Sequence, residues 1–552
     1  MGTSATENKI TVYRARKILT MNRMQPYATH VAIRDGRILS VGGEEQMRAF
    51  NISEIDNTFA DKVLMPGLVE GHSHLYEGVA WLFVYIGYFD RRDPDGVLLP
   101  GLKSKEAIIN RLIEAEQAME GDEPLIAWGF DPLYFGSDRV TTDDLDKISP
   151  TRPVVILHAS MHILNVNSMA LKQAGIDRFT DVEGVARFAN GEPNGELREF
   201  AAMFPVYRMI GDPFRTWGAH PKCLKMFGQI ALNAGVTTAT DLVNELHPEA
   251  VKQLSSLTAQ ADYPVRIVAA ASGRTFGRDT QACVENIKNV SSYAHDKLHM
   301  GMIKLVIDGS IQGFTARLLW PGYHNGAPNG IWASFPPSEL VDIIAEYHRA
   351  GVQMHIHTNG DEATEITLDA LERALSLYPQ FDHRHTLQHC QMATAAQFRR
   401  IAKLGLCVNL FSNHIFYWGD AHQAITLGPD RANNMNAAKT ALQLGIPTAI
   451  HSDAPITPLS PLFIAWCAVN RTTATGTVLG EQERISIEQA LYAITMGAAY
   501  TLHMDDQIGS IEVGKYADFC VLDQDPTTVE PMTLKDIKVL GTMVGRRLFE
   551  CQ

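Results

Sequence analysis

The apolar run VLMPGLVEGHSH at residues 63–74 ends in two histidines and is the stretch that decides the fold. Eight further short apolar runs follow it along the chain: PVVILHAS (153–160), GVTTATDL (235–242), VRIVAAAS (265–272), MIKLVID (302–308), GVQMHIHT (351–358), TLQHC (386–390), LCVNLF (406–411) and IPTAIHSD (446–453). Helical patterns such as PPSELVDIIAEYHRAG (336–351) and AAQFRRIAKLG (395–405) lie between many of these runs. Strands that alternate with helices are typical of βαβ units and predict a parallel sheet.

The number of runs favours a closed barrel. A (β/α)8 barrel needs eight strands, so we assign PVVILHAS to a long insertion at about residues 80–230. We therefore expect an α/β fold with a (β/α)8 TIM-like barrel over residues 65–504 that carries this insertion. A doubly wound sheet is the alternative, but it needs a glycine-rich phosphate-binding turn after its first strand. The sequence contains no such turn.

The two ends of the chain differ from the middle and resemble each other. Strand-like runs occupy residues 10–21 and 30–42, where Asp35-Gly36 is a hairpin signal, and again residues 510–523 and 537–550. We expect these ends to pair, so that residues 1–64 and 505–552 form one small β-sandwich.

Composition narrows the class of protein. The chain has 552 residues and a net charge of −14. A negatively charged surface repels phosphate backbones and anionic lipid, so we expect no nucleic acid or membrane partner. Its seven cysteines form no close pairs, which is typical of a reducing compartment. Neither a signal peptide nor a membrane-spanning run is visible, and we expect a cytoplasmic protein.

Ligand-capable side chains recur at the ends of the predicted strands. His72 and His74 are two residues apart, so both point to the same side of an extended strand. Lys304 lies inside the run MIKLVID, and further such groups lie at the ends of later runs: His355, His357, His389, His451 and Asp453. Active sites of parallel barrels lie at the carboxyl ends of the strands, and imidazole and carboxylate groups bind zinc and related metals. The pattern predicts a metal centre.

Several motifs together resemble the amidohydrolase superfamily, in its amidohydrolase-3 (YtcJ-like) branch, which includes N-substituted formamide deformylase. They are LMPGLVEGHSH (64–74), MIKLVIDGSIQGFTARL (302–318), HTNGDEA (357–363), LQHCQM (387–392), HSDAPITPLSPL (451–462) and IGSIEVGKYADFCVLDQDP (508–526). The resemblance covers almost the whole chain. One departure is His355, because the family more often shows HAIGD where this sequence has HIHTNGD.

The resemblance implies a set of metal ligands and catalytic residues. His72, His74, His357, His389 and Asp453 match the family's ligands, and Asp453 also matches its general base. Lys304 matches the lysine that becomes an N-carboxylated bridge between two metals in binuclear members. Carboxylation would replace a buried cation, which is disfavoured, by an anionic ligand, whereas the alternative is a lysine paired with an acidic residue such as Asp308. We expect one or two divalent metals per chain, with zinc as the first candidate.

Substrate contacts are predicted in three segments. His162 and Asn165 lie in ASMHILNVNS (159–168), which resembles a family segment, and Glu199 follows in NGELREFA. Asp308 and Arg317 belong to VIDGSIQGFTAR, and His414 and Trp418 to the loop FSNHIFYWGD (411–420). For each of these residues a structural role in capping, packing or ion pairing is the alternative.

The leading functional prediction is a metal-dependent amidohydrolase acting on carbon–nitrogen bonds other than peptide bonds. Metal-activated hydroxide would attack an amide, N-acyl or formamide carbonyl of a small organic substrate, with Asp453 as general base and acid. Alternatives on the same scaffold are deamination of a cyclic amidine or heterocycle, hydrolysis of an ester, lactone or carbamate, and decarboxylation. A non-catalytic scaffold is disfavoured because all six predicted ligand positions are intact. Relatives often form dimers, so a homodimer is one candidate assembly.

Overall fold

The computed structural model describes residues 9–50, 54–136 and 139–551, and its central part is a curled sheet of eight parallel strands. The strands lie in the sheet in the same order as in the sequence, and β5 pairs with β14 across the insertion that separates them in the chain. The strands are β5 (Leu68–Glu70), β14 (Val236–Asn244), β15 (Arg266–Ser272), β16 (Leu298–Val306), β17 (Gln353–Thr358), β18 (Thr386–His389), β19 (Cys407–Leu410) and β20 (Thr448–Ile450). Each coincides with one of the predicted runs, and PVVILHAS is not among them, as expected.

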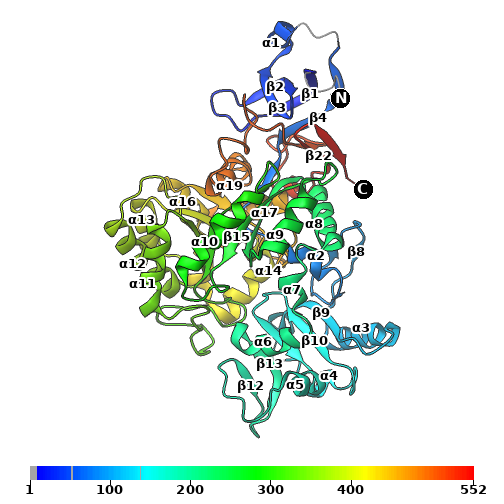
Figure 1. The fold of residues 1–552 in the computed structure, drawn as a ribbon, viewed down its shortest axis with the longest axis vertical. Coiled ribbons are helices and arrows are strands. Elements are labelled where there is room, and N and C mark those ends of the chain that lie inside the picture. Colours follow the sequence, from blue (N-terminus) through cyan, green and yellow to red (C-terminus); the bar gives the residue numbers. More distant parts are fainter. Residues whose placement is uncertain (1–8, 51–53, 137–138, 552) are drawn as a thin grey trace.

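Helices follow most of these strands and cover the outside of the sheet (Figure 1). The predicted helix at 336–351 is α11 (Pro337–Arg349), and the one at 395–405 is α13 (Ala395–Lys403). The latter begins with a capping box, in which the Thr394 side chain and the Gln397 side chain each accept from the other's backbone N–H. Other helices of this layer are α9 (Pro248–Thr258), α10 (Thr280–Val290), α12 (Asp361–Leu377) and α16 (Ala438–Gln443).

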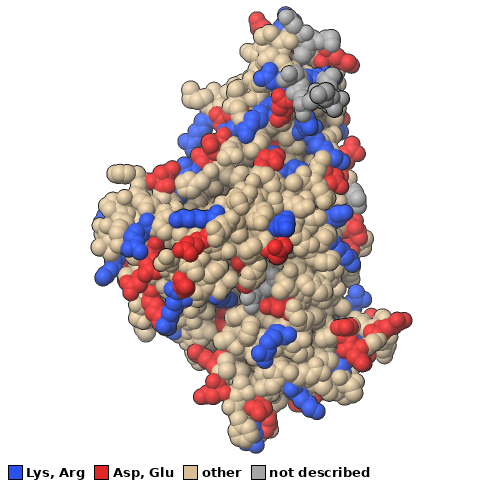
Figure 2. Space-filling view, viewed as in Figure 1, with Lys and Arg blue, Asp and Glu red and all other residues tan. Residues whose placement is uncertain are grey.

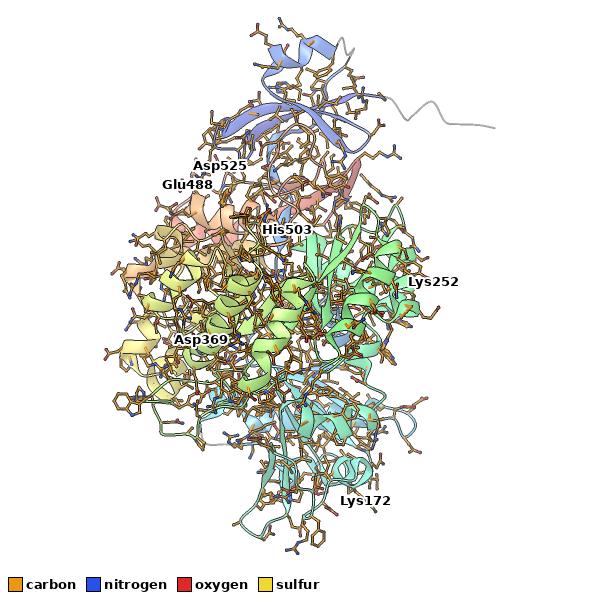
Figure 3. The ribbon with its side chains drawn as sticks, turned by 60° about the vertical axis from the view of Figure 1, so that its left-hand side comes forward. Lys172, Lys252, Asp369, Glu488, His503 and Asp525 are labelled. Carbon is orange, nitrogen blue, oxygen red and sulfur yellow. The ribbon has the colours of Figure 1, made fainter. Side chains whose placement is uncertain are left out.

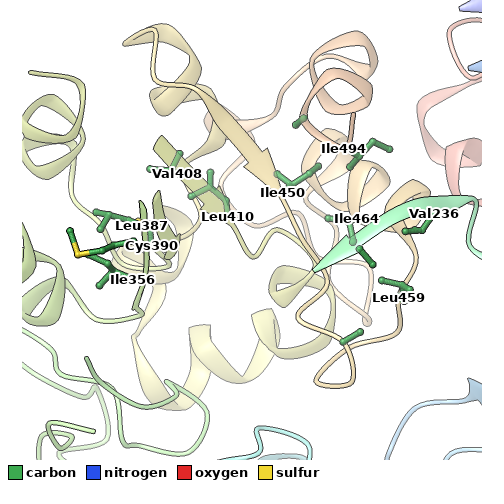
Figure 4. Packing of buried hydrophobic residues seen from close by; sticks show 14 of the residues in the cluster. Val236, Ile356, Leu387, Cys390, Val408, Leu410, Ile450, Leu459, Ile464 and Ile494 are labelled. Atoms are coloured by element: carbon green, nitrogen blue, oxygen red, sulfur yellow. The ribbon is translucent and has the colours of Figure 1, made fainter. Parts of the chain in front are cut away.

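The main core lies between the strands and these helices. Figure 4 shows Ile356, Leu387 and Val408, which occupy the same register on β17, β18 and β19. All three are fully buried. The two edge strands of the sheet meet beyond their carboxyl ends, where Asp453 N donates to His72 O at 3.0 Å and His74 N donates to Ala454 O at 3.0 Å. This junction draws the ends of β5 and β20 together.

The insertion forms a sheet of its own, at the lower end of the molecule in Figure 1. Its six strands, in spatial order, are β12 (Val185–Arg187), β13 (Pro193–Arg198), β11 (Ile163–Val166), β10 (Val154–His158), β9 (Leu125–Phe130) and β6 (Val84–Tyr85). PVVILHAS supplies β10, which confirms its assignment outside the barrel. The helices of this region include α3 (Lys105–Ala118), α5 (Ser168–Ala174) and α6 (Glu199–Met209).

Both ends of the chain join in one seven-stranded sheet at the opposite end of the molecule (Figure 1). Its order is β23 (Arg547–Glu550), β22 (Val539–Val544), β21 (Phe519–Leu522), β4 (Asp56–Pro66), β1 (Thr11–Leu19), β2 (Tyr27–Arg34) and β3 (Arg37–Gly42). The Asp35-Gly36 hairpin is present, with positive φ at both turn residues. The predicted pairing of the two ends is therefore observed, whereas a two-layer sandwich is not confirmed.

The surface mixes both signs of charge. Figure 2 shows lysine and arginine side chains interspersed with aspartate and glutamate over the face in view. Within the described residues, no helix combines the length and the apolar character that crossing a bilayer requires.

Candidate metal centre

The carboxyl ends of the barrel strands gather the six groups that the sequence analysis singled out as ligands. His72 and His74 follow β5, Lys304 lies on β16, His357 and His389 lie on β17 and β18, and Asp453 follows β20. All six line one cavity, and none is more than 8% exposed. Residues that are up to 381 positions apart in the sequence thus meet at one site, as the strand order predicted.

Asp453 connects several of these histidines. Its Oδ1 lies 3.1 Å from Nε2 of His74 and 3.2 Å from Nε2 of His72. Burial raises the pKa of Asp453, but the hydrogen bond with His74 and the nearby His74, His451 and Lys304 together outweigh that effect and hold the pKa below its usual value. One donor atom from each of these three residues lies within 4.8 Å of the other two. An ionised carboxylate beside two imidazoles is a donor set that suits a divalent metal.

His357 and His389 form the second group. Their ring centroids are 4.5 Å apart, and Nδ1 of His357 lies 3.2 Å from Oδ1 of Asp308. Both ring nitrogens of His389 are buried and have no hydrogen-bond partner in the described part of the chain. Leaving a buried donor or acceptor unpaired costs about 1–3 kcal/mol. An unpaired imidazole at this position therefore points to a bound ligand.

Lys304 reaches the same cluster from β16. Its Nζ lies 3.0 Å from Nε2 of His72, and burial lowers the pKa of Lys304 to about 7. Asp308 is not its partner, because the Asp308 carboxylate accepts from the backbone N–H groups of Arg317, Asn359 and Gly360. The structure thus removes the ion pair with Asp308 that was the alternative reading of Lys304.

Three residues that sequence reasoning overlooked hold the predicted ligands in place. Gln388 Nε2 donates to Nδ1 of His355 at 2.7 Å, and its Oε1 accepts from Nδ1 of His72 at 2.7 Å, which leaves Nε2 of His72 for the cavity. Tyr76 stacks on His74 with a centroid distance of 4.6 Å. Such orientation of ligating histidines by neighbouring groups is common in metal sites.

Glu70 is the third overlooked residue and joins the two edge strands. It accepts from the backbone N–H groups of His72 and Ser452 and from the Ser452 hydroxyl. Burial raises the pKa of Glu70 to about 8. The only sequence signal for Glu70 and Gln388 was their position next to a predicted ligand, which does not distinguish them from other strand residues.

The cavity next to these groups has a volume of about 210 Å3, and the wall that faces the predicted ligands is largely apolar. The insertion supplies much of that wall, from the end of β10 and from α6, and β14 and the loop after β20 supply the rest: Leu157, Met161, Phe200, Met203, Val243 and Ile456. Arg274, from the loop after β15, also lines the cavity. The site therefore combines a polar, histidine-rich floor with a largely apolar enclosure.

His162 faces this cavity from the insertion, as predicted. Its Nδ1 lies 3.0 and 2.9 Å from the two carboxylate oxygens of Glu199, and its ring lies 5.8 Å from that of His357. Burial lowers the pKa of His162, but the Glu199 carboxylate more than compensates and raises it above the usual value. The bond at Nδ1 fixes the ring, so that Nε2 is the nitrogen available to the cavity.

The other predicted substrate contacts do not line the cavity, and each has another partner. Asn165 bonds to His158 and to Val140 O inside the insertion sheet. Arg317 forms a two-pronged ion pair with Glu362, and Asp308 caps backbone groups as described above. Trp418 Nε1 donates to Asp131 at 2.7 Å, and His414 Nδ1 lies 2.9 Å from Nε2 of His422. These contacts favour the structural roles that were the alternatives.

Backbone strain is concentrated around the cavity. Met161, Glu199, His389 and Asp453 have φ values of 61°, 60°, 71° and 55°, and all four line the cavity. A residue other than glycine held at positive φ costs of order 1–3 kcal/mol, and such residues cluster at functional sites. The strain accompanies two of the predicted ligands and the Glu199 that orients His162.

The donor set fits a divalent transition metal. Nitrogen and carboxylate donors converge, His74, His357 and His389 carry buried ring nitrogens without a hydrogen-bond partner in the described chain, and neighbouring residues orient the ligands. Parallel strands that present such donors at their carboxyl ends define the class of the barrel-type metal-dependent hydrolases.

Comparison with known proteins gives the family. The sequence model of the Amidohydrolase family matches residues 60–548. YtcJ of Bacillus subtilis is 27% identical over 94% of this chain and 95% of its own length. The N-substituted formamide deformylase of Arthrobacter pascens is 25% identical over 96% of both chains. A crystal structure of an uncharacterized metal-dependent hydrolase from Pyrococcus horikoshii superposes with a TM-score of 0.72 at 20% identity, covering 95% of this chain and 99% of that one.

The chain belongs to the amidohydrolase family, since the family match spans most of its length. It is therefore a hydrolase that acts on carbon–nitrogen bonds, which confirms the class of enzyme expected from the sequence. The resemblance to YtcJ and to the formamide deformylase is likewise confirmed.

Proposed function

We propose that this enzyme hydrolyses a small neutral amide, with N-substituted formamides as the first substrates to examine. The observation that carries the proposal is the cavity itself, in which the cluster of His72, His74, His357, His389, Lys304 and Asp453 faces a largely apolar wall. A volume of about 210 Å3 suits a small organic molecule rather than a polymer. The similarity to the N-substituted formamide deformylase of Arthrobacter pascens supports the choice of formamides.

His72, His74, His357, His389 and Asp453 would hold the metal, with zinc as the first candidate. A divalent metal held there would act as a Lewis acid and would favour ionisation of water at neutral pH. The chain's own residues supply the remaining steps. Asp453 is ionised and lies at the cavity surface, so it can accept a proton from the attacking water and pass it to the departing amine nitrogen.

The apolar wall and the His162–Glu199 pair would position the substrate. The hydrophobic side chains of the insertion exclude water from the N-substituent, and His162 offers Nε2 to the amide group. Glu199 holds the ring so that this contact needs no reorganisation.

We further propose that Lys304 is carboxylated and serves as a bridging ligand. The support is its position: Nζ lies within the ligand cluster at 3.0 Å from His72, and the lysine is 3% exposed. Lys304→Ala should then bind one metal fewer per chain, and added acetate should partly restore binding. An unchanged metal content in that variant would remove the bridging role.

The test of the proposed function is a substrate panel with the zinc-loaded protein. N-substituted formamides, the matching acetamides and cyclic amidines are compared, and the Asp453→Asn variant is the matched control. We expect zinc-dependent release of formate and amine from the formamides. Release of ammonia from the amidines alone would replace the proposal with the deaminase alternative.

A further inference from the structure

His451 is a buried histidine at the site to which the ligand assignment gives no role. It directly follows β20 and is 0% exposed. Both of its ring nitrogens are buried and have no hydrogen-bond partner among the residues that the structure describes. A polar group of this kind is disfavoured in a protein interior unless something binds it.

The state of His451 matches that of a predicted metal ligand. Within the described chain, His389 and His451 are the histidines in which both ring nitrogens are buried and lack a hydrogen bond, although Nδ1 of His389 lies 3.8 Å from Oδ2 of Asp453. The buried His422, by contrast, is hydrogen-bonded at both nitrogens, to His414 and to Thr426. The two unpaired rings are neighbours, with centroids 5.0 Å apart.

The ring of His451 also lies next to that of His72, which is another predicted ligand. Its ring stacks on that of His72 with a centroid separation of 4.6 Å and an interplanar angle of 20°. One nitrogen from each of His72, His389 and His451 lies within 4.8 Å of the other two. Because Gln388 occupies Nδ1 of His72, the nitrogen that His72 can offer is Nε2.

We propose that His451 is an additional metal ligand, and that His72, His389 and His451 form an all-nitrogen site for a divalent transition metal. Imidazole donors select zinc, cobalt, nickel and copper over magnesium and calcium, which prefer oxygen. This site lies beside the cluster of His72, His74 and Asp453, and the two share His72.

Because both clusters use Nε2 of His72, they cannot each hold an ion through that nitrogen at the same time. The two clusters are therefore alternative positions for an ion that uses His72. Removing the carboxylate of Asp453 should therefore move the ion towards the nitrogen site rather than abolish binding. This shift distinguishes a ligand from a histidine that only packs against the centre.

The test measures metal binding alone, so its outcome does not depend on which bond the enzyme hydrolyses. Asp453→Ala protein is freed of metal by chelation and titrated with Co2+, whose visible absorption reports its ligands. We expect Asp453→Ala to bind cobalt, and Asp453→Ala/His451→Ala to bind it at least about tenfold more weakly, with a changed spectrum. The control is Asp453→Ala/His422→Ala, which removes a buried histidine that is already hydrogen-bonded and should bind like Asp453→Ala.

Equal affinity and equal spectra of Asp453→Ala and Asp453→Ala/His451→Ala would overturn the proposal. A second measurement does not depend on how the His451 variant folds. Crystals of Asp453→Ala soaked in Zn2+ should show an anomalous peak within about 2.3 Å of a His451 nitrogen. A peak at His74 or His357 that leaves His451 without contact would overturn the assignment as well.

Discussion

Two groups of histidines occupy opposite ends of the same barrel strands and differ in one respect. At the amino end, His385 directly precedes β18, and the rings of His348 and His383 lie next to it. His383, His385 and His503, which is labelled in Figure 3, line a cavity of about 400 Å3. At the carboxyl end, His389 completes β18. Nδ1 of His385 accepts from Met354 N and its Nε2 lies 2.9 Å from Nδ1 of His348, whereas both nitrogens of His389 lack a hydrogen bond within the described chain.

The difference shows how a structural histidine is distinguished from a candidate ligand. Both groups are rich in buried imidazoles, so burial and residue type do not separate them. Hydrogen bonding separates His385 from His389, because a ring nitrogen that already accepts a hydrogen bond has no lone pair left for a metal. The position along β18 agrees with this criterion, because catalytic groups of parallel barrels lie at the carboxyl ends of the strands, where His389 lies.

The largest expected effect concerns Asp453. Asp453→Asn should lower kcat by at least about a hundredfold, because the amide cannot accept the proton that the carboxylate takes from water. The thermal unfolding temperature should change little. Asp382→Asn, which alters an exposed acid beside His383 at the amino end, is the control and should leave kcat unchanged. If Asp453→Asn retained more than about a tenth of the activity, Asp453 would not be the proton acceptor.

The two ends of β18 can be compared directly with matched substitutions. His389→Gln should weaken metal binding by at least about tenfold, while the unfolding free energy of the metal-free protein stays unchanged. His385→Gln should show the reverse, with normal metal content and a loss of about 1–3 kcal/mol in unfolding free energy, because Met354 N–H and His348 lose their partner. Metal analysis and urea unfolding measure both. Equal effects on metal binding would break the distinction between the two groups.

Glu196 and Glu199 of the insertion are three residues apart and offer the same comparison between a structural group and a group at the site. Glu199 orients His162 at the cavity, so Glu199→Gln should reduce kcat/KM by about tenfold without changing metal content. Steady-state kinetics and metal analysis test this. A variant with wild-type kcat/KM would remove the positioning role of Glu199.

Unlike Glu199, Glu196 should contribute to the free energy of unfolding, and this contribution should be lost at acidic pH. Burial raises the pKa of Glu196, but the guanidinium groups of Arg198 and Arg139 outweigh it and hold the pKa below its ordinary value of 4.5. A lowered folded-state pKa adds stability above pH 4.5, and this contribution is lost as the pH falls through the folded-state pKa. Glu196→Gln should therefore lose about 1–2 kcal/mol at neutral pH, and less at more acidic pH. A pH-independent difference in urea unfolding would contradict this account.

The sequence predicted the strands and the candidate ligands better than the surroundings of the site. Strand ends such as His72 and Asp453 were found because each parallel strand carries its polar groups to the same edge. The partners of Asn165, Arg317 and Trp418 were not foreseen, because Val140, Glu362 and Asp131 come from distant segments whose pairing only the fold determines. The orienting roles of Gln388 and Glu70 were missed for the same reason.

The most direct test of the central claim is the metal content of the unmodified protein. The claim is that the histidines and Asp453 at the carboxyl ends of the strands hold the metal on which hydrolysis depends. Purification without added metal, followed by mass-spectrometric metal analysis, should give about one or two transition-metal ions per chain. Chelation should abolish amide hydrolysis, and zinc should restore it. A chain that binds no zinc at saturation, or that hydrolyses amides equally well after chelation, would contradict the account.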